Sequence, residues 1–442
     1  MIINNIHIDE CLGDRLDAQQ FHPERLSMIR RLKTITCCKL KEVAKNVKTV
    51  TTCLSNEDVY IGLENVTCGT GEYIPGIKES ISTAAVFKKG DILFSKLRPY
   101  LNKVYLAEFS GKSSTEFYIL EATNILPEYL AIILRSDIII AQTKHLVTGN
   151  TLPRLQTSDI ENLLIPYPSS TFQQKIVDLY TAAQNTKLQK DKEAKELLES
   201  IDDYLLEALS INPSQEVSSE SVFTKRISEM IGNRLDVSFY KDRFEMVSEI
   251  YPNKRLSSIV DIDPTIRFTG LADDTPISFI PMECIDDTFG EVKEQRETTI
   301  AQTKGYTKFE ENDLLWAKIT PCMQNGKSAI ARNLTNGIGC GSTEYYVIRP
   351  KTDDLIIDYV YLILRHHAVL KAAQNSFGGS AGQQRVSSQY MKSIVIPHPP
   401  IDVQKSIIET VTHKKERAKQ LQNEGSNVLE EAKATIEKMI LG

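Results

Sequence analysis

The chain carries an internal duplication, and this feature constrains its fold more than any other. Gly13–Asp17 (GDRLD) recurs as Gly232–Asp236 (GNRLD), and Ser114–Tyr118 (STEFY) recurs as Ser342–Tyr346 (STEYY). Matching residues stand 219 positions apart in the first block and 228 positions apart in the second. Because a repeat of this length decides the architecture, we expect two similar domains of about 220 residues each.

Further blocks keep the same order in both copies. Tyr60–Glu64 matches Phe279–Glu283, and Asp91–Leu97 matches Asp313–Ile319. Near the end of each copy, an arginine precedes an Ile-Pro-x-Pro segment by the same spacing, and a glutamine follows. These residues are Arg154, Pro166 and Gln173 in the first copy and Arg385, Pro397 and Gln404 in the second. So many blocks in one order indicate a duplication rather than chance.

Each copy is expected to be a mixed domain followed by a long helix. Short strand-like runs, such as Asp91–Phe94 and Asp313–Trp316, lie between Gly, Pro and Asn residues. Helical stretches follow at Pro127–His145 and Asp358–Ala373. The Ile-Pro-x-Pro segment is typical of extended chain, because each proline disfavours the helical conformation of the residue before it.

Two long helices are predicted, at 172–209 and 402–442. The first contains no Pro or Gly and is rich in Lys, Glu, Ala and Leu, which favour helix. Apolar residues recur at three- and four-residue steps in both, which predicts an antiparallel coiled coil. The alternative is that each helix packs only on its own domain. The predicted pairing residues are Ile176, Leu179, Ala183, Leu197, Ile201, Leu205, Ile407, Val411, Ala418, Leu421, Val428, Ala432 and Met439, and Lys414, Gly425 and Thr435 fill seam positions of the second helix.

The predicted fold class is α+β, with two similar mixed domains, two long paired helices between them and a pseudo-twofold internal repeat. The expected boundaries are a first domain at 1–171, a long helix at 172–209, a linker at 210–220, a second domain at 221–401 and a long helix at 402–442.

Charge and cysteine content exclude several classes of protein. The 52 basic and 58 acidic residues give a net charge of −6, which argues against a protein that coats nucleic acid by bulk charge. The eight cysteines include no C-x-x-C pair, so we expect reduced thiols in a cytoplasmic protein and no metal. We expect no signal peptide, because Met1–Asp17 lacks a basic start followed by an apolar core, and no membrane span, because the apolar runs are shorter than the roughly 20 residues that a span needs.

The chain resembles the specificity (S) subunit of type I restriction–modification systems over nearly its whole length. The resemblance rests on the duplicated mixed domain, on the segments Ile165–Gln173 and Ile396–Gln404, and on the Gly-x-x-Arg-Val loop at Gly382–Val386. The first copy has Thr151–Leu155 at the loop position and lacks its glycine. The resemblance implies that each domain is a target recognition domain that reads one half of a split, asymmetric DNA sequence. It also implies that the helices set the spacer between the halves.

The same resemblance implies the partners. These are double-stranded DNA, two methyltransferase (M) subunits docked on the helices, and restriction (R) subunits, with no membrane. The chain itself would be non-catalytic and hold no cofactor, while S-adenosylmethionine and ATP with Mg²⁺ would belong to the partner subunits. Two alternatives stay open: a restriction endonuclease with its own specificity domain, and a coiled-coil adaptor with no role on DNA.

Candidate DNA contacts lie in two loops of each copy. Arg, Lys, Asn and Gln side chains match base edges and phosphates. The first loop follows a predicted strand and contains Lys96, Arg98, Asn102 and Lys103 in one copy and Lys318, Thr320, Gln324, Asn325 and Lys327 in the other. The second loop precedes the Ile-Pro segment and contains Arg154 in one copy and Gln383, Gln384 and Arg385 in the other. The alternatives are ordinary solvated loops and arginines that hold their own domain to the helix.

Other motifs have simpler interpretations. Phe117–Tyr118 and Tyr345–Tyr346 alternate in strands and are interpreted as core. Asp286 or Asp287 with Glu291 and Lys293 resembles a metal-dependent nuclease site only loosely, and the segment is interpreted as a hairpin turn. The histidines His145, His366 and His367 are expected to lack a partner cluster and to lie at the surface or in helix packing.

Overall fold

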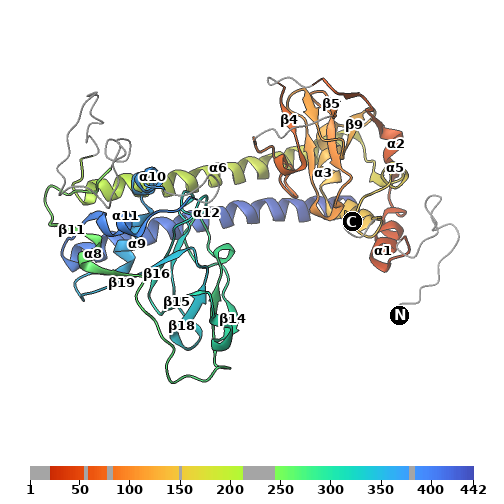
Figure 1. Cartoon of the computed structure of the whole chain (residues 1–442). Helices are drawn as coiled ribbons and strands as arrows, with labels where there is room; N and C mark the ends of the chain where they lie inside the picture. Colours follow the sequence, from red (N-terminus) through yellow and green to blue (C-terminus); the bar gives the residue numbers. More distant parts are fainter. Residues whose placement is uncertain (1–19, 54–57, 77–82, 149–151, 213–243, 378–383) are drawn as a thin grey trace. The chain divides into compact units, whose positions relative to one another are not determined.

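The computed structural model describes residues 20–53, 58–76, 83–148, 152–212, 244–377 and 384–442 (Figure 1). The chain divides into two compact units, Met1–Asp191 with Gln422–Gly442, and Lys192–Leu421. Both divisions fall inside the long helices rather than at the ends of the mixed domains. The repeat blocks Gly13–Asp17 and Gly232–Asp236, and most of the expected linker, lie outside the described residues.

The first unit mixes helices and sheets, as the predicted α+β class requires. Its elements are α1 (Pro23–Leu32), β1 (Cys37–Lys39), α2 (Leu40–Val43), β2 (Ala44–Asn46), β3 (Val50–Thr51), β4 (Tyr60–Ile61), β5 (Ala84–Phe87), β6 (Ile92–Ser95), β7 (Val104–Leu106), β8 (Gly111–Ser113), β9 (Phe117–Ala122), α3 (Pro127–Leu134), α4 (Asp137–Thr143), α5 (Thr157–Glu161), β10 (Leu164–Pro166) and the start of α6 (Ser170–Ala208). Two four-stranded sheets have the orders β2-β9-β6-β7 and β3-β5-β8-β4, and β1 pairs with β10.

The second unit repeats this plan. Its elements after α6 are β11 (Asn253–Arg255), α8 (Leu256–Ile259), β12 (Val260–Ile262), β13 (Pro276–Ile280), β14 (Arg296–Thr299), β15 (Thr307–Glu310), β16 (Leu314–Ala317), β17 (Ser328–Ile330), β18 (Ile338–Gly341), β19 (Tyr345–Pro350), α9 (Ile357–Arg365), α10 (His367–Asn375), α11 (Ser388–Ser393), β20 (Val395–Pro397) and α12 (Ile401–Leu441). The sheet β12-β19-β16-β17 matches β2-β9-β6-β7, and β11 pairs with β20 as β1 pairs with β10. The duplication read from the sequence is therefore a duplication of the fold.

The other sheet differs between the copies at one edge. Both contain a central strand with one parallel and one antiparallel neighbour, namely β8 between β4 and β5, and β18 between β13 and β15. In the first copy the fourth strand, β3, joins the antiparallel neighbour, whereas in the second copy β14 joins the parallel one. The two domains therefore expose different sheet edges.

Each expected helical stretch is two helices rather than one. The chain leaves the helical conformation at Ser136 (φ −79°, ψ 162°) between α3 and α4, and at His366 (φ −55°, ψ 131°) between α9 and α10. The arginine before each break turns back to the domain, since Arg135 Nε donates to Val104 O in β7 at 3.0 Å and Arg365 donates to Gly326 O in the turn before β17. The predicted helical stretches at Pro127–His145 and Asp358–Ala373 are thus confirmed as helical, and each is divided by one break that the sequence did not predict.

The glutamine of the Ile-Pro-x-Pro segment joins the long helix to the mixed domain. Gln173 accepts the backbone N–H of Leu126 at 3.1 Å and donates to Pro168 O at 3.0 Å. Gln404 accepts the N–H of Ile356 at 2.9 Å and donates to Pro399 O at 2.9 Å. Both glutamines are buried, and each satisfies a backbone donor at the start of α3 or α9 that has no partner within its helix.

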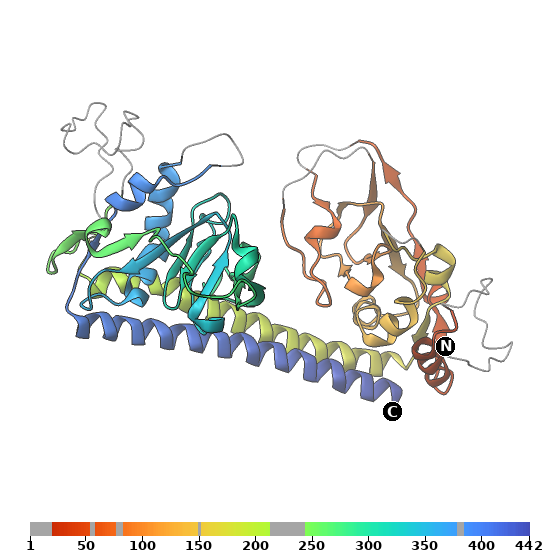
Figure 2. The same ribbon diagram turned by 60° about the horizontal axis from the view of Figure 1, so that its bottom comes forward.

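In each unit, a stretch of α6 lies beside a stretch of α12 that runs the opposite way (Figures 1 and 2). In the first unit, Lys190 pairs with Glu424 at 2.5 Å, and Gly425 lies against the backbone of Lys187. In the second, Lys414 donates to Ser200 Oγ at 2.8 Å. The helices begin and end within two residues of the predicted bounds at 172 and 209 and at 402 and 442.

The predicted pairing residues divide into two groups. Eight are buried: Ile176, Ala183, Leu205, Ile407, Val411, Ala418, Leu421 and Ala432. The other five are only partly buried: Leu179, Leu197, Ile201, Val428 and Met439. Beyond Gly425 the buried positions besides Ala432 and the terminal Leu441 are Leu429, Ile436 and Ile440, one residue after Val428, Thr435 and Met439. An α-helix has 3.6 residues per turn, whereas a strict seven-residue repeat assumes 3.5. The positions predicted from that repeat therefore shift gradually away from the face of the helix that is buried.

The aromatic residues interpreted as core are buried, with Phe117 3% and Tyr345 0% exposed. Among the described residues, we find no helix that is both long enough and apolar enough to span a membrane.

Candidate nucleic-acid interface

The loop after β6 combines exposed and internally bonded candidates. Arg98 is exposed and holds a left-handed backbone conformation (φ 48°), and its N–H donates to Pro153 O at 2.8 Å. Asn102 is buried and donates to Arg135 O at 2.5 Å, while Lys103 donates to Leu63 O at 2.6 Å. Arg98 therefore faces solvent, together with half-buried Lys96, whereas Asn102 and Lys103 hold the loop in place.

The matching loop after β16 has the same division. Lys327 donates to Met282 O at 3.3 Å, which reproduces the bond of Lys103 in the first copy. Lys318 donates to Tyr345 O at 3.3 Å and lies over the ring of Tyr346. The exposed members of this loop are Gln324 and Asn325, and Thr320 is half-buried.

The arginines of the second loop each form an ion pair within their own domain, and we call these two ion pairs braces. Arg154 binds Glu116 through Nε at 3.1 Å and a terminal nitrogen at 2.6 Å. Arg385 binds Glu344 in the same way, at 2.8 and 2.7 Å. The Arg385 guanidinium holds the pKa of Glu344 below its usual range. This geometry favours the alternative in which these arginines hold their own domain.

The braces bring the two candidate loops together. Leu97 and Arg154 form an isolated β-bridge, as do Ile319 and Arg385, and Thr320 N donates to Gln384 O at 3.0 Å. The two loops of each copy are therefore one surface. Gln383 lies outside the described residues.

Sequence reasoning missed the residues that anchor the short helices. Tyr129 donates to Pro166 O at 3.0 Å, and Tyr359 donates to Pro397 O at 2.9 Å. These tyrosines stand 230 positions apart, the separation of Arg135 and Arg365, so the repeat alignment could have found them.

The expectation that the histidines lack a partner cluster was wrong. His145 lies beside His22 and Glu24, and His366 and His367 lie beside Asp202. The partners were missed because each comes from an element more than 100 residues away in sequence.

The acidic residues considered for a nuclease site form a turn, as interpreted. Asp286 accepts the backbone N–H groups of Thr288 at 3.1 Å and Phe289 at 3.3 Å, and Ile285 and Val292 form an antiparallel bridge. These bonds hold the pKa of Asp286 below its usual range, although burial opposes them. Glu291 is engaged by Lys419 of α12.

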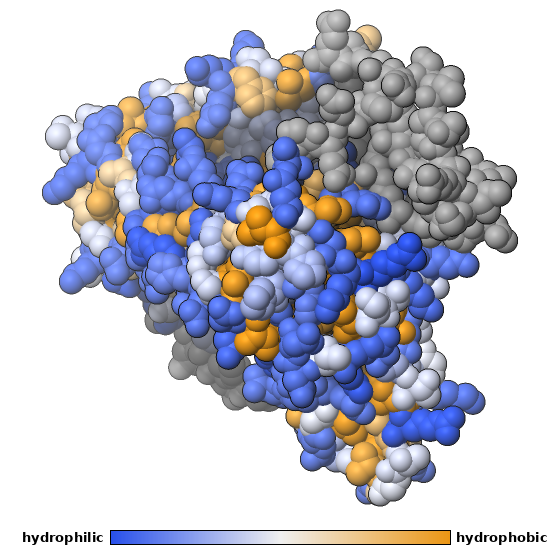
Figure 3. All heavy atoms as spheres, turned by 90° about the vertical axis from the view of Figure 1, so that its left-hand side faces the viewer, coloured by the Kyte–Doolittle hydropathy of each residue, from blue (hydrophilic) through white to orange (hydrophobic). Residues whose placement is uncertain are grey.

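The surface is mixed in character. On the face drawn in Figure 3, hydrophilic residues predominate and small hydrophobic groups are scattered among them. Such a surface suits polar contacts better than the burial of one broad apolar patch.

The sequence matches the family profile described as type I restriction modification DNA specificity domain twice, over residues 34–199 and 252–431. The chain is 38% identical over 156 residues to the type I restriction enzyme EcoEI specificity subunit of Escherichia coli, covering 35% of this chain and 26% of that protein. It is 35% identical over 190 residues to the EcoAI specificity subunit of Escherichia coli, covering 42% and 31%. These matches thus span about a quarter to a third of the length of the two relatives.

A solved structure reported under "Structural basis underlying complex assembly and conformational transition of the type I R-M system" has the same fold. The TM-score is 0.52 at 18% identity, covering 92% of this chain and 96% of that chain. The family match covers both mixed domains and most of both long helices. This chain belongs to the family of type I restriction–modification DNA specificity domains and carries two copies of that domain.

Proposed function

We propose that this chain is the DNA specificity subunit of a type I restriction–modification complex, and that each mixed domain reads one half of a bipartite target. The observation that carries the proposal is the family match in both copies, at 34–199 and 252–431. The different edge strands β3 and β14 support an asymmetric target, because two unlike surfaces select unlike half-sites.

The exposed loop residues are the proposed readers. Arg98 can donate two parallel hydrogen bonds to guanine, and Gln324 or Asn325 can do so to adenine. Lys96 and Lys318 occupy matching positions, which suits contact with phosphate. Arg154 and Arg385 would act on DNA indirectly, by fixing the loops.

The long helices are the proposed spacer and the docking site for two methyltransferase subunits, and the complex would recruit restriction subunits. S-adenosylmethionine and ATP with Mg²⁺ would be bound by those partners, in the cytoplasm, and this chain would be non-catalytic. The first domain (1–171) contains 19 basic and 19 acidic residues, and the second (221–401) contains 21 and 22. This near balance supports the dependence on partners, since contacts of basic side chains with phosphate supply much of the affinity for DNA.

The test is methylation mapping. The full chain is co-expressed with its methyltransferase subunit, and modified adenines are located across the genome. We expect a split motif that vanishes without the chain, and exchange of residues 252–400 for another second domain should change one half-site only. A split motif that persists without the chain would overturn the proposal.

A second arm separates the alternatives. Arg98→Ala and Gln324→Ala should relax one position of one half-site each, whereas Lys41→Ala, at an exposed site outside the loops, should not. Magnesium-dependent cleavage by the purified chain that is lost in Glu291→Ala would favour the endonuclease instead. Crosslinks from both domains to protein only would favour the adaptor.

A further inference from the structure

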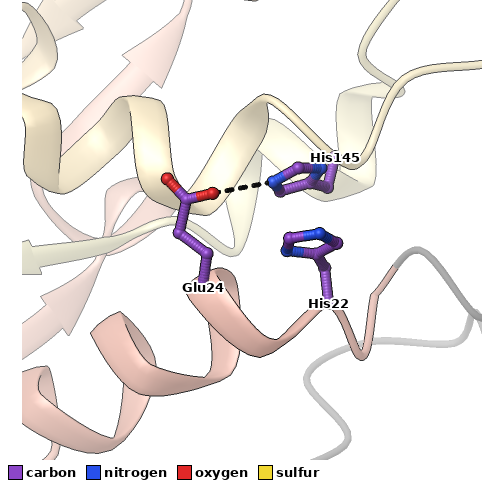
Figure 4. A group of neighbouring side chains, drawn as sticks. All are labelled: His22, Glu24 and His145. Atoms are coloured by element: carbon purple, nitrogen blue, oxygen red, sulfur yellow. Dashed lines mark hydrogen bonds and ion pairs between the residues drawn. The ribbon is translucent and has the colours of Figure 1, made fainter. Parts of the chain in front are cut away.

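Three side chains with metal-binding atoms meet where α1 packs on the end of α4 (Figure 4). His22 immediately precedes α1, Glu24 lies in its first turn, and His145 follows α4. His145 Nε2 lies 3.1 Å from Glu24 Oε2, and the two imidazole rings are stacked with centroids 3.5 Å apart. One ligand atom of each residue lies within 4.8 Å of the others.

We propose that His22, Glu24 and His145 bind a divalent transition-metal ion such as Zn²⁺. Two imidazoles and one carboxylate are a donor set that such ions prefer. In a tetrahedral site with bonds of about 2.0 Å, neighbouring ligand atoms stand about 3.3 Å apart. The 3.1 Å between His145 Nε2 and Glu24 Oε2 already fits this edge.

The third ligand is His22. Its Nδ1 is buried and has no hydrogen-bond partner, and a buried polar nitrogen without a partner is unfavourable. Rotation of the His22 ring out of the stack would bring a lone pair towards the ion. The ion would then satisfy a group that the protein alone leaves unsatisfied.

The surroundings support this arrangement. Lys144 Nζ lies 2.8 Å from both Oε1 and Oε2 of Glu24, which fixes the carboxylate beside His145. Three protein ligands leave the fourth position to water. Arg25 Nε donates to Gln142 O at 3.2 Å, so the same two helices are already held together beside the site.

The site would be particular to the first copy. Residues 22 and 24 precede the first residue matched by the family profile, residue 34. The repeat separation of 230 places Asn375 opposite His145. The ion would therefore hold α1 against the first domain, and the second domain would have no equivalent site.

The cluster of Asp202, His366 and His367 serves as an internal comparison. His367 Nδ1 is bound to Asp202 Oδ2 at 2.6 Å. His366 Nδ1 accepts the N–H of Ala368 at 3.2 Å, so its Nε2 carries the proton; this Nε2 is buried without a partner, like His22 Nδ1, but as an N–H it offers no lone pair. We expect this second cluster to leave the ion unbound.

The test is Co²⁺ titration of the full chain after treatment with a chelator. We expect one equivalent to give visible absorption typical of tetrahedral cobalt, with no thiolate charge-transfer band, and Zn²⁺ to displace it. His22→Ala and His145→Ala should each weaken binding by at least about tenfold. His413→Ala, at an exposed site on α12, and His367→Ala should leave it unchanged.

The melting temperature is a second readout, and it still tests the proposal if an alanine variant folds poorly. His145→Gln retains a group that can hydrogen-bond to Glu24, and its melting temperature without metal should stay near that of the parent chain. Zn²⁺ should raise the melting temperature of the parent but not of His145→Gln. The proposal is overturned if no equivalent of Co²⁺ binds, if a thiolate band shows cysteine ligands, or if the His22 and His145 variants bind like the parent.

Discussion

Asp202 of α6 caps α10 through His367. Oδ2 of Asp202 accepts the backbone N–H of His367 at 3.0 Å and lies 2.6 Å from its Nδ1. In the first unit, the carboxylate of Glu437 on α12 lies near the start of α4, where burial raises its pKa and the backbone of Asp137 and Ile138 lowers it. In both copies, a long-helix carboxylate therefore stands at the start of the domain's second short helix, where backbone N–H groups lack helical partners.

Removing this cap should loosen α10. Asp202→Ala is expected to lower the free energy of unfolding by about 1 kcal/mol, the usual contribution of a capping carboxylate. Urea denaturation measures the loss, and hydrogen exchange should show faster exchange at the first amides of α10. Asp203→Ala, at the exposed neighbouring position, is the control and should change neither. Equal effects of both substitutions would contradict the capping role.

The buried glutamines should matter more than their exposed neighbours. Gln404→Ala leaves the N–H of Ile356 without a partner, which costs about 1–3 kcal/mol of stability. Gln173→Ala should do the same at Leu126. Lys405→Ala is the matched control, since Lys405 is exposed on the same turn. Chemical denaturation of the three variants decides whether the motif glutamine is a structural brace.

Gly425 allows α12 to approach α6 closely. A Cβ added at Gly425 would lie 3.2 Å from the Cα of Lys187. Gly425→Leu should therefore cost about 1–3 kcal/mol through overpacking. Gly425→Ala should be near neutral, because its tight contact offsets about 1 kcal/mol of helix propensity. Ser426→Leu, at an exposed position, should be tolerated, and thermal unfolding compares all three. A Gly425→Leu chain as stable as the parent would show that the helices have room there.

Lys415 should make stability depend on pH. Its Nζ donates to Phe289 O and to the hydroxyl of Tyr361, both at 2.9 Å, and burial lowers its pKa from 10.5 to about 7. Between about pH 7 and pH 10 the unfolded chain holds the proton that the folded chain has released, so stability rises with pH in this range. The slope contributed is at most about 1.4 kcal/mol per pH unit.

Denaturation at pH 7, 8 and 9 checks this sign. In Lys415→Met the rise should be smaller, whereas Lys405→Met should keep the parent's slope because Lys405 is exposed. A slope that survives Lys415→Met would assign the pH dependence to other groups.

The proposed spacer role predicts the result of helix insertion. Four residues added to α6 near Lys190 and four to α12 near Glu424 lengthen each helix by about 6 Å, close to two base pairs. The mapped target should keep both half-sites and gain one or two base pairs of spacer. Insertion into α6 alone should destabilise the chain, because it breaks the register that joins Lys190 to Glu424. Altered half-sites with an unchanged spacer would show that the helices are not the ruler.

The sequence by itself determined the duplication, the mixed class, the extents of the long helices and the family. These properties follow from local patterns, since helix periodicity, proline positions and repeat spacing are all written along the chain. The breaks at Ser136 and His366 were not predicted; each lies beside an arginine whose carbonyl partner is more than 30 residues away, a contact that the local pattern does not encode.

Only the tertiary structure decided which polar residues are held by the fold. Arg154 and Arg98 are both exposed and equally suited to DNA by type, yet the Arg154 guanidinium is bound to Glu116, 38 residues away. Likewise, His145 meets Glu24 from 121 residues away. A charged side chain becomes a brace, a ligand or a reader according to which opposite charge the fold brings beside it, and sequence spacing does not encode that contact.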